Sequence, residues 1–211
     1  MRGKGHSKAL DGVYAAASPD ELARAYADWS ASYDHDTLSL GYALPFVVTS
    51  WLARHVPKGD GPILDAGCGT GLSGGYAKAL GYDRLEGLDF SPDMLAVAAG
   101  RGAYAKLTEA ELGKALPWPD GHFAAFFSTG VFTEGHAPAS ALDELVRITR
   151  PGGYAVLTVR DTVLVSQGFR AKFTELEKED RWETVDESPL FRAFTIAEPE
   201  VLVQAFVFRV L

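Results

Sequence analysis

The chain has 211 residues, of which 47% are hydrophobic and 23% charged, and its formal net charge is −8. This composition is typical of a soluble globular protein, and the acidic balance argues against a broad nucleic-acid-binding surface. A single cysteine excludes an intramolecular disulfide framework, and no apolar run approaches the ~18 residues of a membrane span, so we expect a cytoplasmic protein without a membrane partner.

The N-terminal part of the chain predicts a helical cap. Residues 1–17 are small, polar and alanine-rich, and we expect them to be flexible. Ser18, followed by Pro-Asp-Glu, is typical of a helix start with a capping box, and this helix should run to about Ser32. A second helix is predicted over 44–55. We therefore expect residues 18–61 to form a helical unit that precedes the main fold.

From residue 62 onward, short apolar runs alternate with helical patterns, which indicates an open parallel sheet covered by helices. The predicted strands cover 62–66, 84–89, 103–107, 123–128, 154–160, 188–196 and 201–210, and the predicted helices cover 72–80, 92–99, 141–148 and 169–180. We therefore expect one α/β domain over 62–211, with a mostly parallel, seven-stranded sheet and helices on both faces.

The strongest motif follows the first predicted strand, in the sequence Asp-Ala-Gly-Cys-Gly-Thr-Gly of residues 65–71. Glycine permits a positive φ and close approach of a ligand, and the helix that follows presents backbone N–H groups. Dinucleotide-binding loops need G-x-G-x-x-G/A, but here the third glycine comes one residue early, at Gly71. Asp89 ends the second predicted strand, and a carboxylate at that point can bind both hydroxyls of a ribose.

Four segments together resemble the class I S-adenosylmethionine (SAM)-dependent methyltransferases, in matching order and spacing over about residues 25–160. They are Asp65–Gly71, Gly87–Met94, Leu116–Phe123 and Arg150–Gly153. Residues 128–136 and the aromatic–Asp sequence of the cap are similar to the Williams-Beuren-region methyltransferase-like group. The resemblance implies a Rossmann-like class I methyltransferase fold, with SAM as the cofactor and S-adenosylhomocysteine as its product.

The resemblance assigns the loop to the methionine part of SAM. Asp65 would lie beneath the loop, near the methionine amino group. Other residues would lie along the cofactor, in the loop or at the end of the fourth predicted strand. These residues are Gly67, Cys68, Gly69, Gly71 and Ser128.

The resemblance assigns the adenosine part of SAM to later segments. The residues concerned are Asp89, Phe90, Met94, Glu111 and Leu112. Asp89 would hold the ribose hydroxyls, and the aromatic and methionine side chains would flank the adenine. Many members place an acid–apolar pair before a Leu-Pro loop, and Glu111 would be the acid that bonds the adenine amine. Glu109 is a rival for that role, and a solvated surface glutamate is the alternative reading.

Three aromatic residues of the cap, Tyr26, Trp29 and Tyr33, fall on one helical stripe. Aromatic faces suit the sulfonium cation of SAM, and a cap that excludes water suits the spreading of its charge during transfer. We therefore expect Tyr33 first, and Trp29 second, as cofactor contacts. The alternative is that the stripe only packs the helix against the main domain.

The loop after the fourth predicted strand carries the candidate catalytic pair, Glu134 and His136. Acceptors bind near this point of an open α/β sheet. Methyl transfer depends mainly on positioning, and a base is needed only for a weakly acidic nucleophile. The alternative reading of both residues is loop solvation or helix N-terminal charge. The histidines of the chain show no ligand spacing, so no metal is expected.

The fourth predicted strand ends in Ser-Thr-Gly, and not in the Asn/Asp-Pro-Pro-Tyr/Phe motif of amino-methyltransferases that act on nucleobases or glutamine. Together with the acidic composition, this favours a small-molecule acceptor over nucleic acid. We interpret the chain as a SAM-dependent methyltransferase that transfers a methyl group to a small molecule by in-line displacement. Two alternatives remain: a non-catalytic SAM-binding or interaction protein, and an NAD-dependent oxidoreductase, against which the early third glycine counts.

Overall fold

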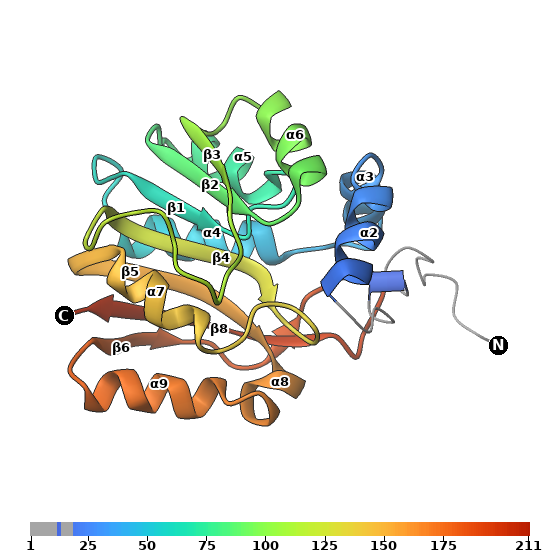
Figure 1. Ribbon diagram of the computed structural model, residues 1–211. Coiled ribbons are helices and arrows are strands. Elements are labelled where there is room, and N and C mark those ends of the chain that lie inside the picture. Colours follow the sequence, from blue (N-terminus) through green and yellow to red (C-terminus); the bar gives the residue numbers. More distant parts are fainter. Residues whose placement is uncertain (1–11, 14–18) are drawn as a thin grey trace.

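The structure, a computed structural model, describes residues 12–13 and 19–211. The segment 1–17, predicted to be flexible, lies outside the described residues except for Gly12 and Val13, and so does the predicted N-cap, Ser18. In the described part, helices surround one central sheet, and a pair of helices lies at its side (Figure 1).

One central sheet contains all the named strands. Their bounds are β1 Ile63–Ala66, β2 Leu85–Asp89, β3 Lys106–Glu109, β4 Phe123–Phe132, β5 Thr149–Arg160, β6 Trp182–Glu187, β7 Phe191–Arg192 and β8 Leu202–Val210. The order is β3-β2-β1-β4-β5-β8-β6, and β7 pairs with β8. Five neighbouring strands of the sheet, in the order β3, β2, β1, β4 and β5, run parallel to one another, whereas β8 is antiparallel to β5, β6 and β7. The predicted Rossmann-like α/β fold is confirmed, with eight strands in the described residues instead of the seven expected.

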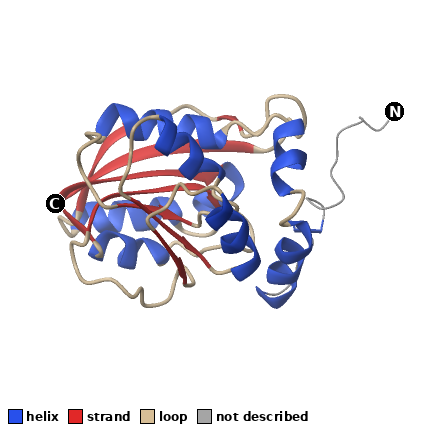
Figure 2. Ribbon diagram, turned by 90° about the horizontal axis from the view of Figure 1, so that it is seen from above, coloured by secondary structure: helices blue, strands red, loops and turns tan. Residues whose placement is uncertain are grey.

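Helices cover both faces of the sheet (Figures 1 and 2). Their bounds are α4 Leu44–His55, α5 Leu72–Ala79, α6 Pro92–Gly100, α7 Ala141–Arg147, α8 Asp161–Ser166 and α9 Phe169–Lys178. Successive residues of a strand point to opposite faces. Phe127 of β4 therefore enters the core under α4 and α5, and Phe126 enters the core under α7, α8 and α9. The helix α6 packs beside β2 and β3.

The elements around the glycine loop form as predicted. All four residues of β1 are buried, as expected for a parallel strand covered on both faces. The helix α5 begins directly after the loop. At α6, the Ser91 side chain accepts a hydrogen bond from the backbone N–H of Met94 at 3.3 Å, which confirms the predicted cap. The loop and the end of β2 therefore meet at one edge of the sheet.

The C-terminal part differs from the prediction. The strand predicted over 188–196 is wrong, because the strand β6 lies at 182–187 and only the two-residue β7 follows. β6 is an edge strand whose side chains are mostly exposed, so its sequence is polar and lacks the apolar run of a buried strand. The third strand lies at 106–109 instead of 103–107, and α8 has no predicted counterpart.

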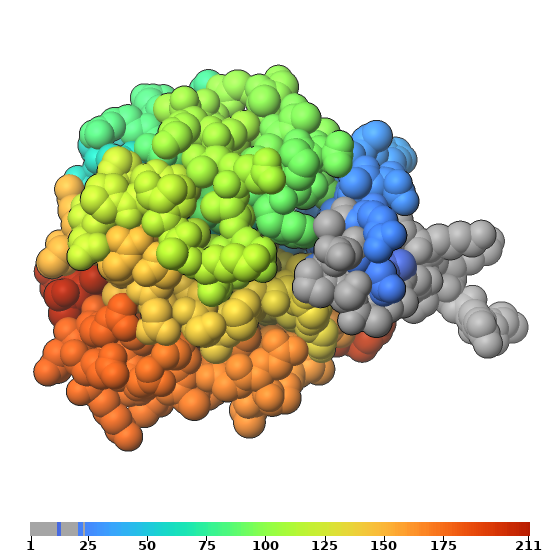
Figure 3. Space-filling view, in the orientation of Figure 1, coloured from blue at the N-terminus to red at the C-terminus, as the bar shows by residue number. Residues whose placement is uncertain are grey.

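The helix predicted over 44–55 is confirmed as α4, but two helices precede it in the cap where the sequence predicts one. Their bounds are α2 Pro19–Trp29 and α3 Tyr33–Ser39. The Ser30 hydroxyl donates to the carbonyl of Ala27, and the side chains of Trp29 and Ser32 both donate to the carboxylate of Asp36. Polar side chains that bond nearby groups compete with the helix and favour its end. Both helices lie at the carboxyl ends of the parallel strands, where the cap (blue) abuts the surface that contains α6 (green; Figure 3).

Candidate active site

The larger of two adjoining cavities, of about 290 Å³, opens between the cap and the carboxyl ends of the central strands. The strand order reverses between β1 and β4, which is where open α/β sheets bind ligands. The wall of the cavity brings together eight of the residues predicted to bind the cofactor. They are Tyr33, Gly67, Gly69, Asp89, Phe90, Met94, Glu111 and Leu112.

Two glycines of the loop meet different constraints. Gly67 has φ +79°, and a Cβ there would lie 2.3 Å from Cγ2 of Val131. Gly69 lines the cavity and has φ +52°, and a Cβ there would meet nothing within 4 Å. Side chains other than glycine rarely adopt such φ values. Gly67 therefore packs the loop closely against β4, whereas Gly69 leaves the cavity open to a ligand.

Asp89 supports the loop from the end of β2. Its Oδ2 accepts a hydrogen bond from the N–H of Gly69 at 2.8 Å, and its Oδ1 accepts one from the N–H of Ser91 at 3.0 Å. Burial raises the pKa of Asp89, and the backbone hydrogen bonds oppose this rise. Each carboxylate oxygen can accept a second hydrogen bond. Asp89 can therefore bind hydroxyl groups in the cavity while it holds the loop.

Asp65 lies below the loop and off the cavity wall, with 0% of its surface exposed. Its Oδ2 accepts a hydrogen bond from the hydroxyl of Tyr104 at 2.7 Å, whereas its Oδ1 has no hydrogen-bond partner among residues 12–13 and 19–211. Burial raises the pKa of Asp65 to about 7, the hydrogen bond from Tyr104 opposes this rise, and the charge of Asp89 adds to it. A buried carboxylate oxygen without a partner suits a cationic ligand group, such as the ammonium group of SAM.

The other side of the larger cavity suits an adenosine. Phe90 and Met94 supply an aromatic and a thioether surface, and Glu111 lines the wall, whereas its rival Glu109 does not. Thr129 lines the cavity, and its buried hydroxyl has no hydrogen-bond partner in the part of the chain that the structure describes, so a polar ligand group would satisfy it. The residues present therefore fit SAM.

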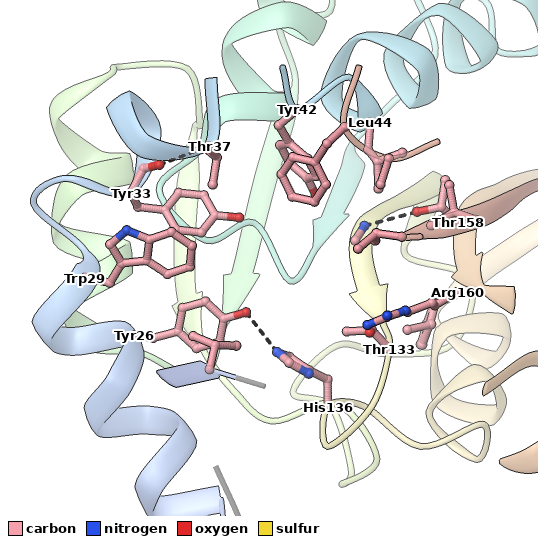
Figure 4. A pocket seen from close by; sticks show the side chains of 17 residues that line it. Tyr26, Trp29, Tyr33, Thr37, Tyr42, Leu44, Thr133, His136, Thr158 and Arg160 are labelled. Atoms are coloured by element: carbon pink, nitrogen blue, oxygen red, sulfur yellow. Dashed lines mark hydrogen bonds between the residues drawn. The ribbon is translucent and has the colours of Figure 1, made fainter. Parts of the chain in front are cut away.

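A second cavity of about 60 Å³ adjoins the larger one (Figure 4). The two cavities share part of their walls, namely Tyr26, Tyr33, Gly130 and His136. The rest of the second cavity is lined by Val13, Trp29, Thr37, Tyr42, Leu44, Phe132, Thr133, Thr158, Arg160, Ala193, Phe194, Val201 and Val203. A ligand in one cavity would therefore lie next to a ligand in the other.

His136 and Tyr26 bond to each other at the shared wall (Figure 4). Nδ1 of His136 lies 2.7 Å from the carbonyl oxygen of Glu134, and Nε2 lies 2.8 Å from the hydroxyl oxygen of Tyr26. Because a carbonyl oxygen can only accept, Nδ1 carries the proton of the neutral ring, and Nε2 accepts from Tyr26. Burial lowers the pKa of His136, although the Glu134 carbonyl and charge oppose this. The imidazole is therefore held neutral, with its lone pair at Nε2.

Glu134 does not line either cavity, and its carboxylate does not contact the imidazole of His136. Its carboxylate accepts hydrogen bonds from Thr133 at 2.8 Å and from Thr162, and it pairs with Arg160 at 3.1 Å. Burial acts to raise the pKa of Glu134, but these hydrogen bonds and the Arg160 charge lower it on balance. The two residues of the predicted catalytic pair therefore interact only through the backbone carbonyl of Glu134, and not through its carboxylate.

Four more predicted cofactor residues lie off the larger cavity. Trp29 lines the second cavity instead. Cys68 is buried, and burial raises the pKa of its thiol, so it packs as a neutral side chain. Ser128 is buried and donates to a backbone carbonyl of β1 at 2.8 Å. Gly71 has φ +82° and stands at the start of α5, so its role is in the backbone of the loop.

A polar cluster that no local pattern indicates ties the cap to the loop. The hydroxyl of Thr70 donates to Asp34 of α3 at 2.6 Å. Nε of Arg101 donates to the carbonyl of Thr70 at 2.6 Å, and Nη2 of Arg101 pairs with Asp34. The three residues come from three separate segments of the chain, so only the folded structure brings them together.

The described residues contain neither a membrane-spanning helix nor a cluster of metal ligands. No helix among residues 12–13 and 19–211 combines the length and apolar character needed to cross a bilayer. In the same residues, no three His, Cys, Asp or Glu side chains gather as a metal ion would require.

The chain matches a family model described as a methyltransferase domain over residues 64–157. It is 35% identical over 179 residues to human methyltransferase-like protein 27, and the aligned region covers 81% of this chain and 71% of that protein. It is 31% identical over 129 residues to the 18S rRNA (guanine-N(7))-methyltransferase of Bos taurus, covering 53% of this chain and about half (46%) of that protein. Among solved structures, a TehB-like SAM-dependent methyltransferase from Corynebacterium glutamicum superposes with a TM-score of 0.63 at 21% identity, covering 89% of this chain and 100% of the other.

Proposed function

The chain belongs to the class I SAM-dependent methyltransferases, and on this premise we propose that it methylates a small molecule bound in the second cavity. The observation that supports this proposal is the wall shared by the two cavities. Two reactants must meet at a common boundary, held in a reactive orientation. The family excludes the oxidoreductase alternative, because the cofactor is SAM.

SAM, when bound, supplies a methyl group on a positively charged sulfonium centre. In this proposal the larger cavity holds the cofactor, with Asp89 binding hydroxyls and Asp65 attracting the ammonium group from below the loop. The rings of Tyr26 and Tyr33 lie 6.4 Å apart at the shared wall. Aromatic faces at this point stabilise a cation, and the cap that carries them limits the access of water.

The second cavity favours a small, largely apolar acceptor that is neutral or anionic. The ring of Tyr42 lies 5.1 Å from the ring of Phe194, and leucine and valine side chains complete much of the wall. Arg160 also lines the cavity, and no carboxylate side chain does so among its described lining residues. A cationic amine would therefore find no carboxylate on this wall, whereas a hydroxyl or carboxylate compound would meet the guanidinium of Arg160, which also pairs with Glu134.

His136 is placed to take a proton from such an acceptor. Its neutral ring presents Nε2 at the shared wall, where Tyr26 donates to it. A hydroxyl that replaces Tyr26 at Nε2, or that bonds to the Tyr26 hydroxyl, would pass its proton to the imidazole as the methyl group is received. The carbonyl of Glu134 would then stabilise the protonated ring through Nδ1. In this scheme Glu134 orients the base and does not act as a second base.

The test is an untargeted screen with isotopically labelled SAM and a small-molecule metabolite extract. We expect label in a low-molecular-weight product with the wild-type protein. His136→Gln should reduce that product by about a hundredfold or more, because general-base catalysis typically contributes this much. The same variant should bind S-adenosylhomocysteine within a few fold of wild-type affinity, since the proposed contacts of Asp89 and Asp65 with the cofactor remain.

Two other results would contradict the proposal. The bovine relative is named for 18S rRNA, so the screen includes total RNA, and label in RNA alone would replace the small-molecule acceptor with a nucleic acid. Tight binding of S-adenosylhomocysteine without any labelled product would favour a non-catalytic SAM-binding protein.

A further inference from the structure

Tyr104 lies below the cofactor loop, between α6 and β3, and its hydroxyl donates to Oδ2 of Asp65 at 2.7 Å. We propose that Tyr104 is a positioning residue for cofactor binding, which holds Asp65 so that its other oxygen receives the ammonium group of SAM. This inference rests on the proposed role of the larger cavity. It gives a function to a residue that lies outside all four of the family-like segments.

The ring of Tyr104 occupies a slot made by three glycines. A Cβ at Gly74 would lie 2.2 Å from the hydroxyl oxygen of Tyr104. A Cβ at Gly71 would lie 3.0 Å from Cε2 of the ring, and one at Gly87 would lie 3.2 Å from Cδ1. Because side chains there would crowd the ring, glycine at these positions keeps the slot open in a close-packed interior. The slot fixes where the tyrosine hydroxyl points.

The hydrogen bond gives the two oxygens of Asp65 different tasks. Oδ2 accepts from Tyr104, whereas Oδ1 is buried and has no hydrogen-bond partner in the described part of the chain. A buried oxygen in this state is costly, and a cationic ligand group would satisfy it. Without the tyrosine hydroxyl, neither oxygen would have a side-chain donor, and the carboxylate would lose its fixed orientation.

The hydrogen bond from Tyr104 also affects the protonation state of Asp65, together with the other groups near this carboxyl. Burial raises the pKa of Asp65 to about 7, the bond from Tyr104 opposes the rise, and the charge of Asp89 adds to it. Cys68 is also close, but burial raises the pKa of its thiol, as it does for the Tyr104 phenol, so both stay neutral. Asp65 must be deprotonated to pair with an ammonium group. Loss of the Tyr104 hydroxyl therefore raises the pKa of Asp65 and shifts tight cofactor binding to higher pH.

Calorimetric titration with S-adenosylhomocysteine, which carries the same ammonium group, tests this inference on the full chain. Wild-type affinity should rise as the pH increases through about 7 and then level off. For Tyr104→Phe, affinity near neutral pH should fall about tenfold, and the rise should move to higher pH. An unchanged affinity profile, or a loss of equal size at every pH, would overturn the assignment.

Tyr82→Phe is the matched control. Tyr82 is 1% exposed, and its hydroxyl donates to the backbone carbonyls of Val56 at 2.6 Å and Leu52 at 3.2 Å, among residues that do not line the larger cavity. The control removes a buried tyrosine hydroxyl, as the test variant does, and should keep the wild-type binding profile. A similar pH shift in the control would mean that any buried tyrosine has this effect, which would also overturn the assignment.

Two neighbouring glycines of α5 provide an independent test. Gly74→Ala should push the Tyr104 hydroxyl away from Asp65, and so reproduce the pH shift of Tyr104→Phe. Gly75→Ala should keep the wild-type profile, because a Cβ there meets nothing within 4 Å. If folded Gly74→Ala protein keeps the wild-type profile of affinity against pH, the glycine slot does not fix the position of the Tyr104 hydroxyl.

Failure of this inference can be told apart from failure of the proposed function. If wild-type protein binds no S-adenosylhomocysteine at any pH, the role of the larger cavity is wrong. If wild-type protein binds it and Tyr104→Phe binds it identically, only the role of Tyr104 is wrong.

Discussion

The two cavities share a wall but are built in different ways. Most of the larger cavity comes from short stretches that follow β1, β2, β3 and β4 at one edge of the sheet. The second cavity comes from the cap, α4, β4, β5 and the segment that leads into β8, which are far apart in the sequence. The shape of the first therefore depends on local backbone geometry, and the shape of the second depends on tertiary packing.

This difference predicts which substitutions should change cofactor affinity and which should not. A change confined to the larger cavity should alter cofactor affinity, and a change confined to the second cavity should leave cofactor affinity as it is. Residues that connect the cap to the loop should have a small effect on cofactor affinity, because they touch the larger cavity only indirectly. Four substitutions test these expectations, from the largest effect to the smallest.

Gly69→Val should have the largest effect on cofactor affinity. Its φ is +52° and a Cβ would enter the space that the ligand needs, so affinity for S-adenosylhomocysteine should fall by about a thousandfold or more. Calorimetry measures this directly. Gly100→Ala is the control, because a Cβ there meets nothing within 4 Å and the residue does not line the cavity. Normal binding by Gly69→Val would refute the loop geometry.

Asp89→Ala should weaken the binding of S-adenosylhomocysteine by about 1–3 kcal/mol, because it removes charge-assisted hydrogen bonds to the ligand and to the loop. The variant loses the acceptor for the N–H of Gly69 as well. Asp93→Ala removes an exposed acid from the first turn of α6 and serves as the control. If calorimetry gives the same affinity for Asp89→Ala and wild type, the ribose site lies elsewhere.

Phe194→Leu should lower stability by about 1 kcal/mol, because a smaller side chain fills the place of a ring that is 4% exposed and packed on Tyr42. Urea unfolding measures the change in the free energy of unfolding. Affinity for S-adenosylhomocysteine should stay within about twofold of wild type, since Phe194 lines only the second cavity. A loss of cofactor affinity as large as that of Asp89→Ala would remove the distinction between the cavities.

Asp34→Asn should lower cofactor affinity only slightly. It breaks the ion pair with Arg101, whose side chain is 28% exposed, so affinity for S-adenosylhomocysteine should fall by about 0.5–1 kcal/mol at low salt. The difference from wild type should shrink as salt is added, because ions screen the pair. Asp186→Asn breaks a pair with Arg54 on the edge strand β6 and is the control. A salt-independent loss would mean that the charge of Asp34 is not responsible.

The larger cavity could be predicted from sequence because its residues carry backbone signals. Glycines before a helix mark the loop, and an acid at the end of the next strand marks its partner. These patterns place Gly67, Gly69 and Asp89 at one edge of the sheet, where the structure brings them together. The same local signals predict the confirmed elements from β1 to α7. Local geometry is visible in a sequence because particular residue types are needed to form it.

The second cavity could not be predicted in this way. The rings of Tyr42 and Phe194 pack against each other although the two residues lie far apart in the chain, and neither residue type by itself indicates such a contact. Glu134 and His136 are close in sequence, yet the carboxylate of Glu134 turns to Arg160 and only its carbonyl meets the imidazole. Tertiary packing decides both cases. The polar edge strand β6 escapes prediction for the same reason.

The most direct test of the two-cavity arrangement is a structure of the protein with S-adenosylhomocysteine bound. We predict that the ligand fills the larger cavity, with its ribose at Asp89 and its ammonium group toward Asp65, and leaves the second cavity open beyond His136. Ligand in the second cavity, or a ribose away from Asp89, would contradict the assignment of the two cavities.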